Sequence, residues 1–187
     1  MENRMLNLLN VCRKGSRALG PGLRYVIWTQ GCPFNCKGCT TPEGQPIVKR
    51  QLVDVKLMAS DIIKRKEIEG ITISGGEPFL QAPSLSLFIR LVRKERPDMN
   101  VIAFTGFKIE ALRSPEAKSL LSELDVLIDG PFVEHFKTKK GLRGSSNQRI
   151  HFLTNRLMAY KDELNNGDRL FETKIDNDSI NTIGIPT

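Results

Sequence analysis

The chain has 187 residues, of which 40% are hydrophobic and 26% are charged, and its formal net charge is +7. This is an ordinary globular composition, and a chain of this length buries a sizeable core. No apolar run approaches the length of a membrane span, and the N-terminus lacks the basic-then-apolar layout of a signal peptide. We therefore expect a cytoplasmic protein without a membrane partner. Aromatic residues make up only 6% and no stacking-rich motif is present, so the positive charge does not predict nucleic-acid binding.

Strands and helices are predicted to alternate along the chain. Apolar residues at helical spacing and short β-branched runs mark the elements, and proline or N-cap residues mark several boundaries. In chain order, the predicted elements are a strand at 24–29, a helix at 54–66, a strand at 71–74, a helix at 84–95, a strand at 101–104, a helix beginning at Ser114 and a strand at 126–128. Such alternation predicts an α/β protein with parallel strands joined by right-handed crossovers.

Three of the four cysteines follow the first predicted strand. Cys32, Cys36 and Cys39 have the spacing C-x3-C-x2-C, which places three thiolates on one short loop. Three thiolates can hold three corners of a cubane iron–sulfur cluster, whose usual complement is four cysteines. The fourth iron would then be open to a further ligand, so this loop predicts a reactive metal centre.

A zinc site and a disulfide framework fit this cysteine loop less well. A structural zinc site usually has four Cys or His ligands, and Cys12, His135 and His151 show no ligand spacing to the loop. A disulfide framework is typical of short secreted chains, and nothing in this sequence indicates secretion. We interpret Cys12 as a spare buried thiol, because free cysteine packs as a small hydrophobic residue.

A second motif, Ser74-Gly75-Gly76-Glu77-Pro78, follows the strand predicted at 71–74. Two glycines at a strand end allow a ligand to approach the backbone closely, since no Cβ intervenes. Glu77 adds a carboxylate beside that backbone. Taken alone, the motif is as consistent with a plain strand–turn–helix corner as with a binding site.

In combination, the cysteine spacing and the S-G-G-E-P string resemble the radical S-adenosylmethionine superfamily. The resemblance implies a partial, open βα barrel and one 4Fe–4S cluster held by the three cysteines. It also implies that S-adenosylmethionine chelates the open iron, with Gly75, Gly76 and Glu77 receiving its methionine ammonium group. In that family the reduced cluster cleaves the cofactor, and a 5′-deoxyadenosyl radical then abstracts a hydrogen atom from the substrate. No catalytic residue beyond the cluster ligands is implied, because the cofactors carry the chemistry.

Further strings between residues 20 and 150 narrow the resemblance. They are G-P-G-L-R at 20–24, F-T-G-F at 104–107, D-G-P-F at 129–132 and R-G-S-S-N-Q at 143–148. Their order resembles the activating enzymes of anaerobic (class III) ribonucleotide reductase. This implies a glycyl-radical partner, with the large subunit of that reductase favoured, and an external one-electron donor. An alternative is the same chemistry on a different peptide or small molecule, and a distant one is a non-catalytic iron–sulfur or zinc module.

Several residues near these strings have two interpretations. Phe34 either shields the cluster and flanks the adenine or anchors the cysteine loop to the core. Thr105 and Gly106 resemble the strand-end segment that lines the adenosyl site. Asp129 binds a ribose hydroxyl or a cation, or only stabilises its own turn. Residues 147–148 either meet the partner protein or satisfy nearby backbone groups.

The resemblance ends near residue 150. We expect residues 1–150 to form the radical S-adenosylmethionine domain and residues 151–187 to form a C-terminal extension packed on the same domain. The activators that this chain resembles stop soon after the N-Q string, so the extension is a departure, and one interpretation is a lid over the open side of the barrel. The basic run at 137–143 is either a docking surface for an acidic partner or a solvated loop.

Overall fold

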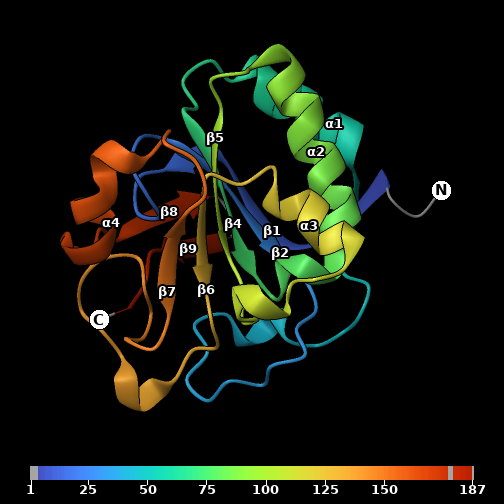
Figure 1. The fold of residues 1–187 in the computed structure, drawn as a ribbon. Coiled ribbons are helices and arrows are strands. Elements are labelled where there is room, and N and C mark those ends of the chain that lie inside the picture. The colour runs from blue at the N-terminus through green and yellow to red at the C-terminus, as the bar shows by residue number, and fades with distance from the viewer. Residues whose placement is uncertain (1–3, 177–178, 187) are drawn as a thin grey trace.

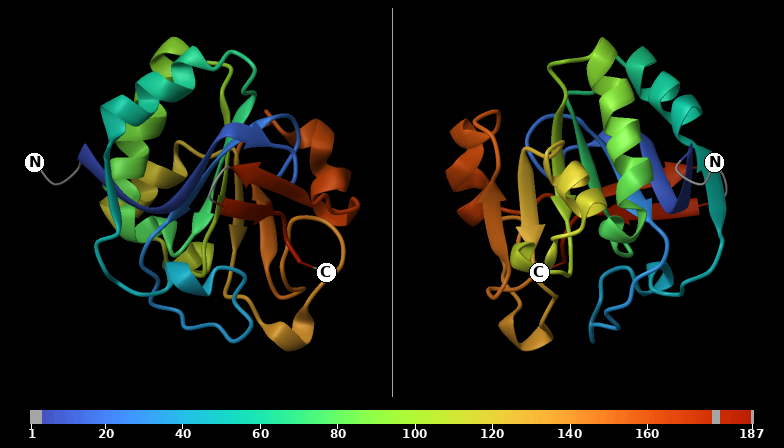
Figure 2. Two further views of the ribbon diagram at one scale, coloured as in Figure 1. Left: turned by 180° about the vertical axis from the view of Figure 1, so that it is seen from behind. Right: turned by 45° about the vertical axis from the view of Figure 1, so that its right-hand side comes forward.

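The computed structural model describes residues 4–176 and 179–186. It is a mixed α/β structure with a mostly parallel central sheet of seven strands, in the order β3-β1-β2-β4-β5-β6-β7, and a separate hairpin of β8 and β9. The helices α1, α2 and α3 cover one face of the sheet, while α4 and the hairpin lie on the other side (Figures 1 and 2). Within the described residues, no helix has the length and apolar character needed to cross a bilayer.

The elements have the following bounds. The strands are β1 Met5–Ser16, β2 Arg24–Thr29, β3 Gln51–Asp54, β4 Gly70–Gly75, β5 Asn100–Phe104, β6 Val126–Asp129, β7 Arg149–Phe152, β8 Glu172–Asp176 and β9 Ser179–Ile183. The helices are α1 Val55–Lys64, α2 Ala82–Glu95, α3 Pro115–Leu121 and α4 Lys161–Asn166. Short 3-10 helices lie at Pro42–Gly44, Pro78–Gln81, Ile109–Ala111, Glu134–Phe136 and Met158–Tyr160.

The predicted alternation of strands and helices is confirmed between residues 24 and 129. The strand predicted at 24–29 coincides with β2, and β4, β5 and β6 overlap the other predicted strands. Asp54 caps α1 by accepting hydrogen bonds from the backbone N–H groups of Lys56 and Leu57. Ser114 caps α3 in the same way through the N–H of Ala117. These caps satisfy donors that the first helical turn leaves unpaired.

The predicted strands form the parallel centre of the sheet, and both edges of the sheet are antiparallel. The strands β2, β4, β5 and β6 are parallel, but β1 runs antiparallel to β2 and to β3. At the other edge, β7 runs antiparallel to β6. The strand β1 was not predicted, although its buried Leu6 and Leu8 alternate with more exposed residues, as in a half-buried strand.

The two faces of the sheet pack against different parts of the chain. On β2, Tyr25 and Ile27 belong to the large core that includes α1 and α2, whereas Val26 faces the opposite side. That opposite side is covered only in part: Val26 packs with Ile183 of β9, and β6 packs with Leu164 of α4. The partly covered face therefore leaves room for cavities.

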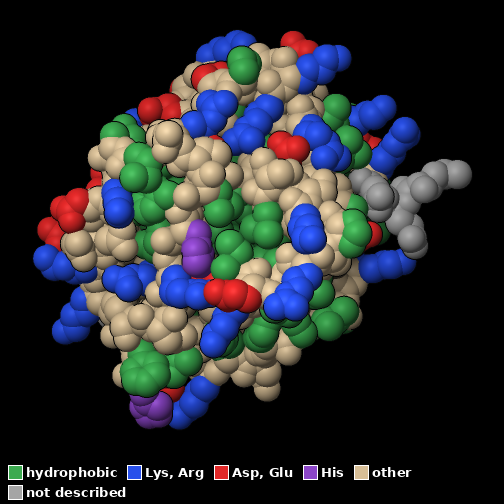
Figure 3. Space-filling model, viewed as in Figure 1, with side chains coloured by type: hydrophobic (Ala, Val, Ile, Leu, Met, Phe, Trp, Pro, Cys, Tyr) green, Lys and Arg blue, Asp and Glu red, His purple; other side chains and the backbone are tan. Residues whose placement is uncertain are grey.

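The basic run at 137–143 is partly built into the fold. Lys137 and Lys140 form isolated β-bridges with Ser145 and Asp168, and Leu142 is buried against α4. On the face in Figure 3, Lys and Arg side chains are scattered among apolar and acidic ones, with no single large basic patch.

A buried arginine joins three strands of the sheet. The guanidinium of Arg24 donates hydrogen bonds to Thr72 Oγ1, Asn100 Oδ1 and the carbonyl oxygens of Pro21 and Ile71, at 2.6–2.9 Å. Burial lowers the pKa of Arg24 to about 9, so the group stays charged at neutral pH. A Cβ on Gly70 would lie 2.5 Å from Arg24 Nη1, so glycine at position 70 leaves the space for this guanidinium.

We predict that Arg24→Met lowers the free energy of unfolding by about 3 kcal/mol, because four buried acceptors lose their donor. Arg17→Met is the matched control, since the Arg17 side chain is 59% exposed, and we expect it to change stability by less than about 0.5 kcal/mol. Chemical denaturation of both variants measures the difference. Equal stability of the two variants would contradict this assignment.

Candidate functional site

The loops that follow β2, β4, β5 and β6 line one cavity of about 320 Å³. Because these four strands are parallel, their carboxyl ends meet at one edge of the sheet. The loops contribute the three cysteines, Gly75 to Glu77, Phe104 to Gly106, and Gly130 with Phe132. The tertiary structure therefore brings together nearly all of the site residues that the sequence predicted.

The thiols of Cys32, Cys36 and Cys39 all line this cavity, and all three residues are half-buried and outside any disulfide. Burial raises the pKa of both Cys32 and Cys36. Opposing hydrogen bonds from the backbone of Phe34 to Cys32 and of Phe132 to Cys36 favour the thiolates. Hydrogen bonds of this kind are typical partners of metal-bound sulfur.

The donor set of the cavity bears on the kind of metal centre. Among the described residues, no three His, Cys, Asp or Glu side chains gather closely enough to hold a single metal ion. A cubane cluster spreads its thiolates over separate irons, whereas zinc requires all of its ligands around one centre. Three thiols line the cavity, a donor set that can hold three corners of a 4Fe–4S cluster, and no fourth cysteine or histidine occurs among the described residues that line it.

The cysteine loop is held in place through main-chain contacts with Gly76. The N–H of Gly76 donates to the Thr29 carbonyl at 2.7 Å, and the N–H of Glu77 donates to the Gly31 carbonyl at 2.8 Å. A Cβ on Gly76 would lie only 2.3 Å from the Gly31 oxygen. Gly75 has φ +100°, a conformation that favours glycine. Both glycines are thus needed for the close approach of the two loops.

Glu77 lies fully buried beneath these loops. Its Oε1 accepts hydrogen bonds from Phe79 N at 2.9 Å and Thr105 Oγ1 at 2.8 Å, and its Oε2 accepts one from Gly106 N at 2.8 Å. Burial raises its pKa to about 7, although these hydrogen bonds favour the charged form. No Lys or Arg in the described part of the chain forms an ion pair with Glu77. Since a carboxylate has about four acceptor positions, one remains for a donor in the cavity.

Phe34, Thr105 and Gly106 connect the cysteine loop to the loop after β5. The ring of Phe34 meets the ring of Phe107 edge-to-face, with centroids 4.7 Å apart. A Cβ on Gly106 would lie 2.5 Å from the Phe34 ring, so glycine is required there. Phe34 therefore anchors the loop, and it also lines the cavity, which keeps both of its predicted interpretations open.

Asp129 lies at the end of β6, but it is not among the residues that line this cavity. Its buried carboxylate accepts hydrogen bonds from the Arg149 guanidinium and from Ile109 N at 2.7 Å, and His151 Nε2 lies 3.1 Å away. Burial raises its pKa, but the Arg149 and Ile109 hydrogen bonds outweigh this effect and hold the pKa below its usual value. These contacts favour the interpretation that Asp129 stabilises its own turn.

Several cavity residues were not predicted as binding residues. Gln148 lies buried in the wall, where its side chain donates to the Gly130 carbonyl at 2.9 Å and accepts from Ser145 N at 3.1 Å. Gln148 therefore forms hydrogen bonds with nearby backbone groups, which is one of its two predicted interpretations. Trp28 contributes from β2, and the tail contributes Phe171, Gly184, Ile185 and Pro186. The tail residues belong to no sequence motif that could have predicted them, and they reach the site only through folding.

Comparison with known proteins agrees with this geometry. The family model described as a 4Fe–4S single cluster domain matches residues 18–151. The anaerobic ribonucleoside-triphosphate reductase-activating protein of Haemophilus influenzae is 34% identical over 140 residues, which cover 71% of this chain and 89% of that protein. The protein of the same name from Enterobacteria phage T4 is 34% identical over 70% of this chain and 85% of its own length.

A pyruvate formate-lyase-activating enzyme from Staphylococcus aureus is 42% identical, but over only 38% of this chain and 32% of that enzyme. The family-model match over residues 18–151 includes the cysteine loop and the other strand-end loops of the cavity. The chain therefore belongs to the 4Fe–4S single cluster domain family and to the family of the anaerobic ribonucleoside-triphosphate reductase-activating proteins.

Proposed function

We propose that this protein is a radical S-adenosylmethionine enzyme that generates a glycyl radical on a partner enzyme, with anaerobic ribonucleotide reductase as the target. One observation carries the proposal: three thiols share a cavity with the buried carboxylate of Glu77. No fourth cysteine or histidine occurs among the described residues that line this cavity, and the carboxylate has no cationic partner there. Three thiolates leave one iron of a 4Fe–4S cluster open, and the carboxylate suits an ammonium group. The family assignment supports the same cofactors.

Each part of the cavity has a proposed task. Cys32, Cys36 and Cys39 hold the cluster, and the Gly75–Gly76 backbone with Glu77 receives the methionine ammonium. When bound, the cluster and S-adenosylmethionine supply a carbon radical that can abstract a hydrogen atom from a glycine Cα. We place the adenosyl group beside Thr105 and Gly106 and against Phe34, and we assign Asp129 to its turn. The chain's residues thus bind, orient and shield, as expected where cofactors carry the chemistry.

Three wider features belong to the same proposal. We interpret the sheet as a partial barrel, because α1–α3 cover one face (Figure 2), while Trp28, which lines the cavity, packs with Val26 on the other. We interpret residues 151–187 as an extension packed on the same domain, since Leu157, Leu164 and Ile183 are buried against it. The reaction requires an external one-electron donor. Cluster thiolates also require a reducing compartment, which supports a cytoplasmic location.

We predict that anaerobic reconstitution with iron and sulfide gives a 4Fe–4S cluster that cleaves S-adenosylmethionine upon reduction. Mixing with the reductase from the same organism should then give a glycyl doublet in electron paramagnetic resonance. Replacement of Cys32, Cys36 or Cys39 by Ala should abolish cleavage, because the cluster loses a ligand. Cys12→Ala should retain it, since Cys12 does not line the cluster cavity.

Two results would contradict this function. Cleavage without a glycyl signal on the reductase, but with product formed from another peptide or small molecule, would support the alternative substrate. Zinc in the purified protein, with no cleavage after reconstitution, would support a non-catalytic module.

We predict that Glu77→Gln lowers the affinity for S-adenosylmethionine as well as stability. The amide retains one acceptor oxygen but turns an N–H group toward the donors that Glu77 now satisfies, which costs about 1–3 kcal/mol. Bound S-adenosylmethionine raises the melting temperature of the protein. If Glu77→Gln no longer binds the ammonium group, this increase should be lost. Thermal unfolding with and without S-adenosylmethionine separates the two effects. If the variant melts earlier but keeps the full cofactor-induced shift, Glu77 only supports the loops.

The pKa of Glu77 also predicts a pH dependence. Its folded pKa is raised to about 7, so the carboxyl takes up a proton as the pH falls below this value. The proton then competes with the ammonium group, and affinity for the cofactor should fall from about pH 8 to about pH 6, by up to about tenfold. Calorimetric titration across this range measures the change, and a flat profile would contradict the ammonium assignment.

A further inference from the structure

The segment from Gln30 to Arg50, which carries the three cysteines of the site, is held at both ends by one residue of β1, Asn7. The carbonyl of Asn7 accepts a hydrogen bond from the N–H of Gln30 at 2.9 Å. At the far end of the segment, Asn7 Nδ2 donates to the Val48 carbonyl at 2.7 Å, and Asn7 Oδ1 accepts from the N–H of Arg50 at 2.9 Å. One asparagine therefore joins the two ends of the cysteine segment.

Gln81 fixes the main chain of Asn7 in turn. It is the last residue of the 3-10 helix Pro78–Gln81, which directly follows Glu77. Its Oε1 accepts from the N–H of Asn7 at 2.7 Å, and its Nε2 donates to the carbonyls of Asn7 at 2.8 Å and Gln30 at 3.2 Å. The Gln81 amide thus connects the loop that carries Glu77 with the start of the cysteine segment.

Gln30 continues this connection into the segment itself. Its side chain is buried, and its Nε2 donates to the carbonyls of Pro46 at 2.6 Å and Glu43 at 3.2 Å. The N–H groups of residues 31 and 32 then donate to the carbonyls of residues 44 and 45, at 2.8 and 2.9 Å. The first cysteine of the site therefore lies two residues from Gln30, on main chain that is bonded to the returning part of the segment.

Between its cysteines, the segment has little hydrogen bonding of its own. Within residues 32–39, all of which the structure describes, the single internal backbone hydrogen bond runs from Cys39 N to Cys36 O at 3.3 Å. The positions of the three thiols therefore depend on how the ends of the segment are held. Metal ligands require such support, because a loosely held binding geometry lowers affinity for the metal centre.

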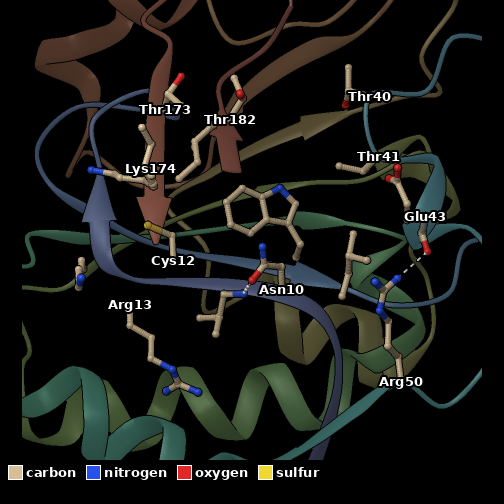
Figure 4. A pocket seen from close by; sticks show the side chains of 16 residues that line it. Asn10, Cys12, Arg13, Thr40, Thr41, Glu43, Arg50, Thr173, Lys174 and Thr182 are labelled. Atoms are coloured by element: carbon tan, nitrogen blue, oxygen red, sulfur yellow. Dashed lines mark hydrogen bonds between the residues drawn. The ribbon is translucent and has the colours of Figure 1, made fainter. Parts of the chain in front are cut away.

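The three amides act on the site from outside its cavities. Glu43 and Arg50 of the segment line a second, larger cavity of about 700 Å³, and Arg50 Nη1 lies 3.5 Å from the Glu43 carbonyl there (Figure 4). Asn7, Gln30 and Gln81 are absent from the described residues that line this larger cavity and from those that line the smaller cavity of the cysteines. Any effect of these side chains on a bound cofactor is therefore transmitted by the main chain that they hold.

We propose that Asn7, Gln30 and Gln81 form an amide clamp that positions the cysteine segment for the iron–sulfur cluster. The clamp bonds the start of this segment to the loop of Glu77, so it also fixes the thiol of Cys32 relative to the carboxylate that we assign to the ammonium group. This inference rests on the proposed function, since it takes the cluster as the group that the thiols hold. The three amides are positioning residues, because they act through the loops and not on the reacting atoms.

Gln81→Glu tests the clamp with a small change in shape. A carboxylate keeps the acceptor for Asn7 N, but it turns an oxygen without a hydrogen toward the carbonyls of Asn7 and Gln30. Gln51→Glu is the matched control, because it introduces the same change at an exposed position on β3. Asn7→Asp is a second clamp variant, in which the donor to the Val48 carbonyl is lost. Thermal unfolding first confirms that all of the variants fold.

Hydrogen exchange of the full-length protein before reconstitution measures the segment directly and needs no metal. The N–H groups of Gly31 and Cys32 report on it, because both are hydrogen-bonded within the segment. We expect both to exchange about tenfold faster or more in Gln81→Glu and Asn7→Asp, since loss of a hydrogen bond makes local opening easier. Gln51→Glu should exchange at the wild-type rate.

The reconstituted protein provides the second measurement. We expect the clamp variants to release iron to a chelator under anoxia about tenfold faster than wild type and Gln51→Glu, as is usual when support behind a metal ligand is lost. The electron paramagnetic resonance spectrum of the reduced cluster should also change in the clamp variants. A purely structural role would lower the melting temperature but leave this spectrum and the rate of iron release unchanged.

The outcomes separate this inference from the proposed function. Unchanged exchange in both clamp variants overturns the clamp. Faster exchange with wild-type iron release and an unchanged spectrum overturns its role in positioning the cluster, and the proposed function stands. If wild type itself assembles no cluster, the proposed function fails together with the cluster role, and the exchange rates then decide only whether the three amides hold the segment.

Discussion

The contact between Gly76 and the cysteine loop is the constraint on which the rest of the site depends. Two backbone hydrogen bonds join the segments, from Gly76 N to Thr29 O and from Glu77 N to Gly31 O. The approach is so close that any side chain at position 76 would overlap the Gly31 carbonyl. These main-chain contacts hold the loop that carries the thiols against the end of β4, and its three cysteine side chains line the cavity.

Glu77 extends this arrangement to the next strand. Its carboxylate joins its own loop to Thr105 and Gly106 after β5, and the Phe34 ring packs on Gly106 from the cysteine loop. A buried carboxylate without a cation is costly, as its raised pKa shows. Carboxyl groups with strongly perturbed pKa values cluster at functional sites. The same group can thus hold the loops together and prepare the cavity for an ammonium.

The tail takes part in the lining of both cavities. Its residues complete one wall of the smaller cavity and one wall of the larger. Most residues that line the larger cavity precede or follow the family match, among them Leu9 to Lys14 of β1 and Thr173 to Ile175 of β8.

The sequence alone determined the chemistry-bearing loops and the strands that carry them. The C-x3-C-x2-C spacing, the Gly75-Gly76-Glu77 string and the alternation from residue 24 to residue 129 are local patterns, so they could be interpreted without a structure. Only the tertiary structure decided the antiparallel edges, the inward position of Gln148, the saturation of Asp129 by Arg149, and the place of the tail over the inner face. These features depend on contacts between residues far apart in the chain. Such contacts produce no periodicity or fixed spacing that could be recognised in the sequence.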